Sequence, residues 1–308
     1  IEAKDFAEAI KNPQNSCAYP NVITRCTPSN KLDILQWMQS KNYVCAMTGD
    51  GVNDSPSLNH ADVGIAMGTG TSVAKEAADI VLLDDAFPSI VTGVKWGRSL
   101  YKNIQNFLYL QLSINISACL IAVFSPLVGI NMPFTVTQFL WINLVMDSLA
   151  AIALASEPAD EKVLLDKPRD KKEFIINKSL GKAIFGFGGF IWALCLTILF
   201  GIEHTDFLKE CGLNKLAEFF EGINLTIFFA TYMCINWWNM FNARVVGKNK
   251  SIFNGLLKNS KFIGILVFIL VVTIIIVQVG GEVFSTEPLS FSTWLTIILV
   301  TSPICWVK

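Results

Sequence analysis

The sequence has little charge and no paired metal-binding cysteines. Only 16% of its 308 residues are charged and 52% are hydrophobic, with a mean hydropathy of +0.48. This composition excludes an ordinary soluble protein and indicates several membrane spans. The net charge of −1 indicates no nucleic-acid partner. None of the eight cysteines belongs to a Cys-x-x-Cys pair, so we expect free thiols and neither a zinc site nor a disulfide framework.

The chain also lacks a recognisable start. It opens at Ile1 without an initiator methionine, a signal peptide or a transit peptide, in the middle of an α/β pattern. We therefore expect the C-terminal part of a longer protein whose N-terminal part is missing. The stretch from Gly68 to Lys75 likewise lacks the Gly-Lys-Ser/Thr ending of a phosphate-binding loop. We interpret that stretch as a strand-to-helix turn with a Ser/Thr cap.

One ten-residue stretch, from Met47 to Pro56, contains several polar side chains that could bind a metal ion or a phosphate. It reads Met-Thr-Gly-Asp-Gly-Val-Asn-Asp-Ser-Pro and follows an apolar run, residues 43–47, that we interpret as a buried β-strand. The carboxylates of Asp50 and Asp54 and the amide of Asn53 therefore follow the carboxyl end of a strand, where α/β sheets bind ligands. Carboxylate oxygens in such a turn suit Mg2+.

Residues 1–94 alternate between short apolar runs and helical patterns. We expect a helical pattern over 1–19 that is broken at Asn12-Pro13, followed by a strand over 22–26. A helix is expected from Pro28 to about Ser40, with its first turn capped by Thr27. Strand and helix then repeat over 43–47 with 55–61, 63–67 with 71–78, and 80–84 with 88–94. This alternation predicts a parallel, doubly wound α/β sheet.

Residues 104–308 form the apolar part of the chain and follow a basic stalk at 95–103. Six apolar segments there approach the ~20 residues that cross a bilayer. They cover residues 104–125, 134–155, 180–201, 223–243, 262–280 and 289–307. We therefore expect a transmembrane domain, an α-helical bundle of six transmembrane spans in contact with the lipid bilayer.

Basic residues are unevenly distributed between the predicted loops. The loops after the second and fourth spans are rich in lysine and arginine, whereas the opposite loops hold only Lys209 and Lys215. The positive-inside rule places the basic loops, the soluble part and Lys308 in the cytoplasm. The basic loop residues are Lys162, Lys167, Arg169, Lys171, Lys172 and Lys178, then Arg244, Lys248, Lys250, Lys258 and Lys261.

Polar side chains within the predicted spans indicate an ion site, because charge in a bilayer is costly and usually functional. Asn143 and Asp147 of the second span lie four residues apart, so on an α-helix both face the same side. Asn115 of the first span is as far from Gly129 as Asn143 is, and therefore lies at a similar depth. Two amides and a carboxylate form the hard-oxygen cluster that Ca2+ takes. Hydrogen bonding between helices is the alternative for each.

The stretch from Thr48 to Pro56 resembles the hinge motif of the P-type ATPases, cation pumps that form an aspartyl-phosphate. The resemblance continues through residues 61–68 and 77–82 into the predicted spans and covers nearly the whole chain. It implies that residues 1–94 are the C-terminal part of a haloacid-dehalogenase-like phosphorylation domain. It also implies ATP as the substrate and Mg2+ as the cofactor.

The resemblance assigns roles to residues of the soluble part. Asp50 matches a Mg2+ ligand, Asp54 a catalytic carboxylate that orients the same Mg2+ site, and Asn53 a residue that bonds a phosphoryl oxygen. Lys31 matches the catalytic lysine that contacts the phosphorylated aspartate, and Arg25 matches a basic residue near the nucleotide phosphates. The phosphorylated-aspartate motif itself, Asp-Lys-Thr-Gly-Thr, is absent. We therefore expect this chain alone to be inactive and the whole protein to be the enzyme.

The second span, from Asn143 onward, resembles the plasma-membrane-type calcium pumps, including bacterial relatives. Two-site calcium pumps have a glutamate three residues after the asparagine of the first span, where this chain has Ala118. Asn236 stands where they have another glutamate, and we expect it to tune the vacated site weakly or to pack. The resemblance implies a single Ca2+ site built from Asn143 and Asp147 with help from Asn115, completed by a carboxylate outside this chain.

The sequence thus predicts that the whole protein moves Ca2+ out of the cytoplasm, driven by ATP, across a plasma membrane or a bacterial inner membrane. Three alternatives stay open: a secretory-pathway-type pump that carries Mn2+ as well as Ca2+, another cation pump of the same family, and a non-catalytic membrane regulator. The combination of Lys31 with Asp50, Asn53 and Asp54 argues against the regulator, because a membrane anchor needs none of these four residues.

Overall fold

The computed structural model describes every residue except 12–20, 131, 168, 171–172, 248–250 and 308. The chain divides into two compact units, one made of residues 1–97 and 161–173 and the other of residues 98–160 and 174–308. Five basic residues used in the orientation prediction lie outside the described residues: Lys171, Lys172, Lys248, Lys250 and Lys308.

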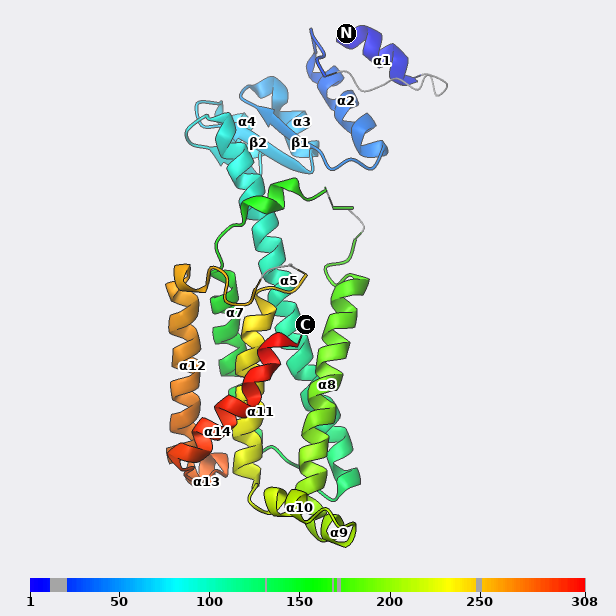
Figure 1. Cartoon of the computed structure of the whole chain (residues 1–308). Helices are drawn as coiled ribbons and strands as arrows, with labels where there is room; N and C mark the ends of the chain where they lie inside the picture. Colours follow the sequence, from blue (N-terminus) through cyan, green and yellow to red (C-terminus); the bar gives the residue numbers. More distant parts are fainter. Residues whose placement is uncertain (12–20, 131, 168, 171–172, 248–250, 308) are drawn as a thin grey trace. The chain divides into compact units, whose positions relative to one another are not determined.

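The first unit contains a three-stranded parallel sheet with the strand order β1-β2-β3 (Figure 1). Strand β1 (Ala46–Gly49) pairs with β2 (Val63–Met67), and β2 pairs with β3 (Ile80–Leu82). Helix α3 (Ser55–His60) follows β1 and helix α4 (Ser72–Ala77) follows β2. The predicted parallel α/β arrangement is confirmed over these elements.

Two helices precede the sheet. Helix α1 covers Ala3–Lys11 and helix α2 covers Pro28–Ser40. The side chain of Thr27 caps the first turn of α2, as the Thr-Pro start predicts. Phe6 of α1 and Trp37 of α2 make an edge-to-face contact, with 5.4 Å between the ring centroids. The two helices therefore share one small aromatic core.

Two expectations for this unit are wrong. The stretch 22–26 is not a strand and contributes a single isolated bridge at Thr24. Arg25 adopts a φ of 55°, which an extended strand cannot accommodate. The apolar run 43–47 is not a buried strand either, because β1 begins three residues later and the side chain of Tyr43 is 60% exposed.

Helix α5 is continuous from Phe87 to Phe124. It joins three elements that the sequence analysis separates, namely the helix at 88–94, the stalk at 95–103 and the first span at 104–125. Pro88 stands in its first turn, where proline is tolerated, and no further proline occurs before Pro126. The stalk is therefore part of one long helix rather than a separate segment.

Four helices of the described chain are long and apolar enough to cross a membrane: Phe87–Leu127, Val136–Ala155, Lys178–Glu203 and Ser260–Val279. The other two predicted spans are also helical, as α11 (Leu225–Ala243) and α14 (Phe291–Thr301). Neither of them belongs to the set of four. A multi-pass helical bundle is confirmed, whereas the count of six spans is not.

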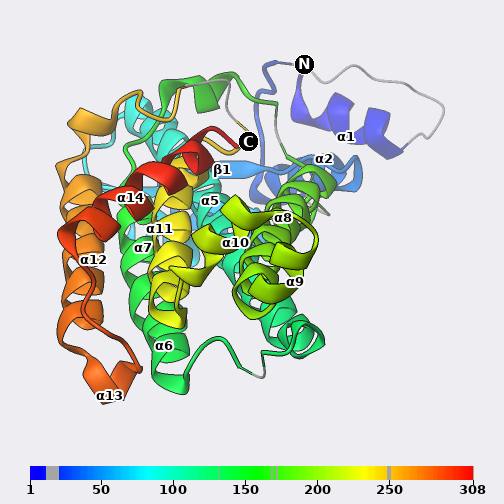
Figure 2. The ribbon, with the colours of Figure 1, turned by 60° about the horizontal axis from the view of Figure 1, so that its bottom comes forward.

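Helix α11 is the most extensively buried helix of the bundle. It contacts α8 (Lys178–Glu203), α12 (Ser260–Val279) and α14 (Figure 2). Helix α12 in turn contacts α7 (Asp147–Ala155). Phe228 and Tyr232 of α11 are fully buried in the apolar core that these helices share. The polar side chains of α11 therefore lie in a water-poor environment.

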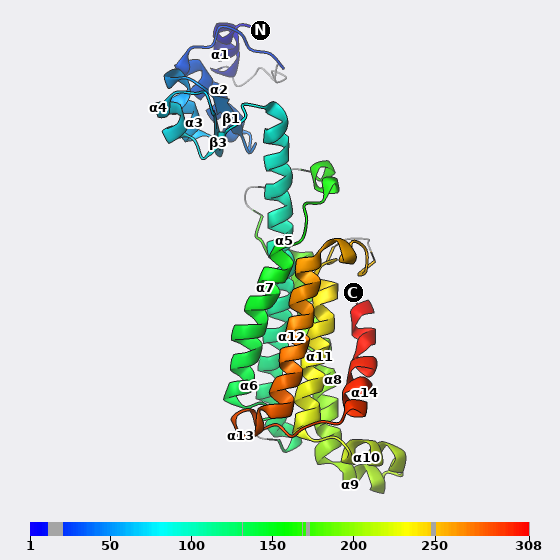
Figure 3. The same cartoon turned by 90° about the vertical axis from the view of Figure 1, so that its left-hand side faces the viewer.

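The connections at one end of the bundle are helical, where the sequence analysis expects only loops. Helices α9 (Thr205–Glu210) and α10 (Asn214–Glu221) connect α8 to α11, and α13 (Gly281–Phe284) follows α12. All three lie at the same end of the bundle (Figures 1 and 3). This agrees with the predicted topology, in which both connections belong to one side of the membrane.

Candidate functional site

The first candidate site is the turn that follows β1. Strand β1 ends at Gly49, Asp50 comes next, and a 3-10 helix over Val52–Asp54 leads directly into α3. This places the side chains of Asp50 and Asp54 at the carboxyl end of a parallel strand, as the sequence predicts.

Asp54 holds this turn in place through its side-chain contacts. Its carboxylate is buried, with 5% of the residue exposed, and its Oδ1 lies 2.5 Å from Nζ of Lys31, which comes from helix α2. Its Oδ2 accepts hydrogen bonds from the backbone amides of Asp50 at 3.4 Å and Gly51 at 3.3 Å. The structure therefore brings together Lys31, Asp50 and Asp54, which the sequence analysis selected.

The surroundings of Asp54 keep it ionised. Burial opposes the charged form, but the hydrogen bond and charge of Lys31, together with the two backbone amides, outweigh it and lower the pKa of Asp54 below its usual value. A pKa that is lower in the folded state contributes stability above the unfolded pKa. This contribution is lost as the pH falls through the folded pKa. At neutral pH the Lys31–Asp54 ion pair is therefore intact.

Gly49 allows the side chain of Asp54 to cross directly over the backbone of β1. A Cβ atom at position 49 would lie 2.5 Å from Cβ and 2.8 Å from Cγ of Asp54. At Gly51 the same atom would meet nothing closer than 3.8 Å.

We expect Gly49→Ala to displace Asp54 and to destabilise the first unit by about 1–3 kcal/mol, as overpacking does. Gly51→Ala is the matched control, because it keeps the backbone amide and adds the same methyl group without a close contact. Thermal unfolding of the two variants measures the difference. Equal melting temperatures would contradict the close approach at Gly49.

Asp50 fits a Mg2+ ligand. Its side chain is exposed, and its carboxylate accepts no hydrogen bond from the residues that the structure describes. Mg2+ takes one or two protein carboxylates and completes its octahedron with water and phosphate oxygens. The described residues contain no group of three or more His, Cys, Asp or Glu side chains that could hold an ion alone. Asp50 is therefore suited to a Mg2+ that arrives with a phosphate.

The other two predicted residues of this unit lie in different surroundings. Asn53 is exposed within the 3-10 helix, so its amide is accessible to a ligand. Arg25 donates to Oε1 of Glu2 at 2.9 Å, and its side chain is 80% exposed. The structure records no contact between Arg25 and the turn among the described residues.

The second candidate site lies in the helical bundle, at Asp147. This aspartate is the first residue of α7 and is 3% exposed. Neither of its carboxylate oxygens has a hydrogen-bond partner among the described residues. Burying an unpartnered carboxylate is strongly unfavourable. Its surroundings are therefore incomplete without a cation or a further polar group.

Asn143 does not share the buried environment of Asp147, in contrast to the expectation that both face one side. A π-helical turn over Trp141–Met146 precedes α7, and within it Asn143 is exposed. A π-helical turn has more residues than an α-helical turn, so the α-helical spacing used for the prediction does not apply. Such turns occur often at functional sites.

Asn115 and Asn236 differ in how their amides are used. Asn115, on α5, is half-buried. Asn236, on α11, is fully buried, and its Nδ2 donates to the carbonyl of Tyr232 at 2.9 Å. The Oδ1 of Asn236 has no partner within the described chain. An acceptor oxygen is therefore left free in the interior of the bundle.

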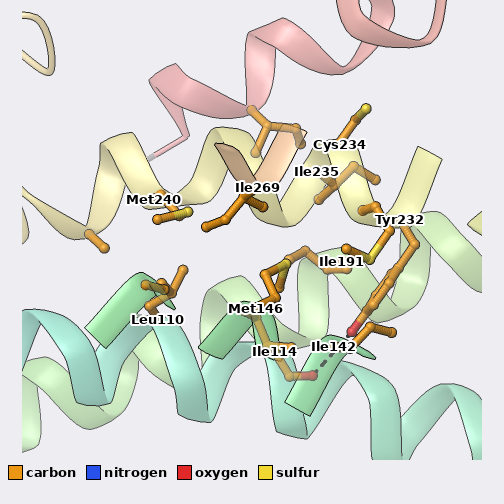
Figure 4. Close-up of a cluster of buried hydrophobic side chains, with 14 of the residues drawn as sticks. Leu110, Ile114, Ile142, Met146, Ile191, Tyr232, Cys234, Ile235, Met240 and Ile269 are labelled. Carbon is orange, nitrogen blue, oxygen red and sulfur yellow. Dashed lines mark hydrogen bonds between the residues drawn. The ribbon is translucent and has the colours of Figure 1, made fainter. Parts of the chain in front are cut away.

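Tyr232 links α11 to α5, and no sequence pattern predicts this contact. Its hydroxyl donates to the carbonyl of Ile114 at 3.2 Å (Figure 4) and lies 2.9 Å from the hydroxyl of Ser117. The ring lies beside Ile142 and Ile191 in the apolar cluster of Figure 4. A single tyrosine in an apolar helix carries no sequence signal for such a link.

A buried charge network, also missed from the sequence, lies where α11 ends. Nε of Arg244 is 2.5 Å from Oε1 of Glu157, and Nδ2 of Asn259 donates to the same oxygen at 3.1 Å. The guanidinium of Arg244 also lies 4.8 Å from the ring centroid of Phe262. From the sequence alone, Arg244 is expected only to be a charged loop residue. The one available signal was its place at the end of an apolar segment.

Comparison with known proteins gives matches along almost the whole chain. Residues 131–308 match the family described as cation transporting ATPase, C-terminus, and residues 32–91 match the haloacid dehalogenase-like hydrolases. Plasma membrane calcium-transporting ATPase 1 of Homo sapiens is 37% identical over 322 residues, which cover 99% of this chain and 26% of that protein. Calcium-transporting ATPase 8, plasma membrane-type, of Arabidopsis thaliana is 37% identical over 306 residues, which cover 97% and 28%. The chain spans about a quarter of the length of these relatives.

Proposed function

The chain belongs to the cation-transporting ATPases, and on that premise we propose that the whole protein exports Ca2+ from the cytoplasm, driven by ATP, through an aspartyl-phosphate. The names of the relatives support Ca2+ as the cargo. The sequence of this chain has no Asp-Lys-Thr-Gly-Thr motif. The phosphorylated aspartate is therefore assigned to the part of the protein outside this chain.

The observation that carries the Ca2+ assignment is the buried carboxylate of Asp147, which has no hydrogen-bond partner within the part of the chain that the structure describes. A charge within a bilayer is tolerated where an ion or a partner neutralises it. Both oxygens of Asp147 are free to bind a cation, and Ca2+ favours carboxylate and amide oxygens. We assign Asp147 as the main ligand.

The side-chain amides of three asparagines complete the proposed set of Ca2+ ligands, and the structure supports them to different degrees. Asn143 is exposed on the π-helical turn, where a group from outside this chain can meet the same ion. Asn115 assists from α5. Asn236 is the weakest candidate, because its amide nitrogen already bonds its own helix and only Oδ1 is free. We propose a single Ca2+ site, because Ala118 offers no oxygen from its side chain.

For the soluble unit we propose that Asp50 holds Mg2+ and that Lys31 contacts the phosphorylated aspartate. Bound Mg2+ supplies positive charge to the phosphoryl oxygens. Asp54 fixes the ammonium of Lys31 and the backbone of the turn, and Asn53 offers its amide to a phosphoryl oxygen. Arg25 is proposed near the nucleotide phosphates, which requires that its exposed ion pair with Glu2 opens. Such exposed pairs are weak.

We propose a multi-pass protein of the plasma membrane, or of a bacterial inner membrane, whose soluble unit faces the cytoplasm. The six predicted spans include α11, with 19 residues, and the shorter α14. We also propose that the phosphorylation domain ends at residue 94 and that the transmembrane domain begins after residue 103. The stalk between them, residues 95–103, lies within α5.

ATP-driven uptake of radioactive Ca2+ into inverted membrane vesicles by the full-length protein tests this function. We expect vanadate-sensitive uptake together with an acid-stable phosphoenzyme. Equal uptake of Mn2+ would move the assignment to a secretory-pathway-type pump, and ATPase activity independent of Ca2+ would overturn the ion. If the full-length protein forms no phosphoenzyme, the proposed pump function is wrong and the non-catalytic membrane regulator is the remaining alternative.

A further inference from the structure

Two neighbouring aspartates, Asp84 and Asp85, lie between strand β3 and helix α5 and have separate structural partners. Asp84 accepts hydrogen bonds from the amide of Ala86 at 3.2 Å and from the hydroxyl of Ser89 at 2.6 Å, and so contacts the segment that enters α5 and the first turn of that helix. Asp85 faces another segment of the chain. Its Oδ1 accepts a short hydrogen bond from the amide of Gly68, just beyond the end of β2.

Asp85 holds the segment that follows β2 by more than one bond. The amide of Thr69 donates to its Oδ1 at 3.3 Å and to its Oδ2 at 3.2 Å. Asp85 does so with a φ of 50°, a left-handed conformation that costs a non-glycine residue energy. Bonds to an ionised carboxylate are stronger than neutral bonds, and they offset that cost.

The segment held by Asp85 directly contacts the backbone of Asp50. The amide of Thr71 donates to the carbonyl oxygen of Asp50 at 2.9 Å. A Cβ atom at Gly70 would lie 3.0 Å from the same oxygen and 3.2 Å from Cα of Asp50. The residue at position 70 must therefore be small, so that the segment can reach the turn.

Asp50 is consequently held from two sides. Oδ2 of Asp54 accepts from its amide, and the amide of Thr71 donates to its carbonyl. The carboxylate of Asp50 itself is left unconstrained by any described residue. The direction of the Asp50 carboxylate is therefore set by the backbone of Asp50, which the hydrogen bonds with Asp54 and Thr71 hold in place.

We propose that Asp85 is a positioning residue for the Mg2+ site, acting through Gly68, Thr69 and Thr71 to fix the backbone of Asp50. This role rests on the proposed function of Asp50 as the Mg2+ ligand. Asp85 makes no contact with the ion or the phosphate in this scheme. It restricts the conformations of the turn before the ion binds, which improves binding because less ordering is needed at that moment.

The charge state of Asp85 is consistent with this role. The hydroxyl of Thr69 and the amides of Gly68 and Thr69 lower the pKa of Asp85 below its usual value, against some desolvation and the charge of Asp84. Asp85 is therefore ionised at neutral pH, and its support persists across the physiological range.

Asp85→Gly in the full-length protein is the variant that tests the proposal. Glycine adopts the left-handed conformation freely, so this change removes the carboxylate without adding backbone strain. Asp85→Asn keeps one acceptor oxygen and also tolerates this conformation. Asp79→Ala is the matched control, because Oδ2 of Asp79 accepts from the amide of Gly64 at 2.8 Å, near the other end of β2.

Hydrogen exchange provides a readout that is independent of activity. We expect Asp85→Gly to accelerate exchange about tenfold at the amides of Gly68, Thr69 and Thr71, and Asp85→Asn to accelerate it less. Asp79→Ala is expected to accelerate exchange at Gly64 and to leave Thr71 unchanged. Unchanged exchange at Thr71 in Asp85→Gly, despite faster exchange at Gly68, would break the proposed chain of contacts and overturn the inference.

The Mg2+ dependence of phosphoenzyme formation provides the second readout. We expect Asp85→Gly to raise the half-saturating Mg2+ concentration about tenfold, with Asp85→Asn intermediate and Asp79→Ala unchanged. A lower phosphoenzyme yield at an unchanged Mg2+ requirement would reduce Asp85 to a structural residue and overturn its positioning role. A full-length parent that forms no phosphoenzyme at any Mg2+ concentration would instead overturn the proposed function, and this inference with it.

Discussion

Replacing Asp147 with asparagine is expected to have opposite effects on transport and on stability. We expect Asp147→Asn to abolish ATP-driven Ca2+ uptake by the full-length protein, because the buried carboxylate is the main proposed ligand. In the absence of Ca2+ we expect the same variant to unfold at a higher temperature than the parent. The reason is that a buried, unpartnered ion costs several kcal/mol, whereas a neutral amide costs less.

Two measurements on the same preparations test this prediction. Ca2+ uptake tests whether Asp147 is a ligand of the transported ion. Thermal unfolding with and without Ca2+ measures how much the buried charge of Asp147 destabilises the folded protein. The parent should gain stability with Ca2+, as any ligand of the folded state causes, and Asp147→Asn should lose that gain. Asp206→Asn, an exposed carboxylate on α9, is the control and should change neither measurement. If Asp147→Asn is less stable than the parent in the absence of Ca2+, Asp147 has a partner in the whole protein, and the prediction is wrong.

Removing the guanidinium of Arg244 is expected to be the most destabilising single change in the bundle. Arg244→Ala leaves the largely buried Glu157, whose side chain is 13% exposed, beside Asn259 without its cation. Breaking a buried ion pair in this way costs about 3–5 kcal/mol. The contact with the ring of Phe262 is lost as well. Thermal unfolding in detergent measures the loss.

The double variant Arg244→Met with Glu157→Gln separates the charge from the packing. It removes both charges together and keeps most of the volume, so we expect it to recover much of the stability that Arg244→Ala loses. Arg25→Ala is the surface control, because its pair with Glu2 is exposed and worth about 1 kcal/mol or less. Equal losses in Arg244→Ala and Arg25→Ala would contradict the burial of the network.

The parts of the fold that the sequence predicts well are those with strong local signals. Helix α2 begins where Thr27 and Pro28 indicate, because capping depends only on neighbouring residues. The strand predicted at 22–26 is wrong because Arg25 adopts a left-handed conformation, and no sequence signal marks that conformation in an arginine. The sequence does not predict the continuity of α5, because a change in composition at the membrane boundary resembles the end of a helix.

The candidate sites divide in the same way. Asp50, Asp54 and Lys31 come together because the turn after a strand and the helix before it meet at one edge of the sheet. The pair of Arg244 and Glu157 joins residues 87 positions apart, so only the packed bundle reveals it. The environment of Asn143 depends on a π-helical turn, and no residue type marks such a turn in the sequence.

The π-helical turn over Trp141–Met146 has a consequence for insertions and deletions in this span. An α-helix advances by about 100° per residue, and a π-helical turn accommodates an additional residue. Deleting one residue within 141–146 would allow a regular α-helix but would rotate everything before the turn relative to Asp147. Evolution can therefore exchange side chains in this segment more freely than it can change the segment's length. Among relatives, we expect the number of residues between Asn143 and Asp147 to vary less than their identity.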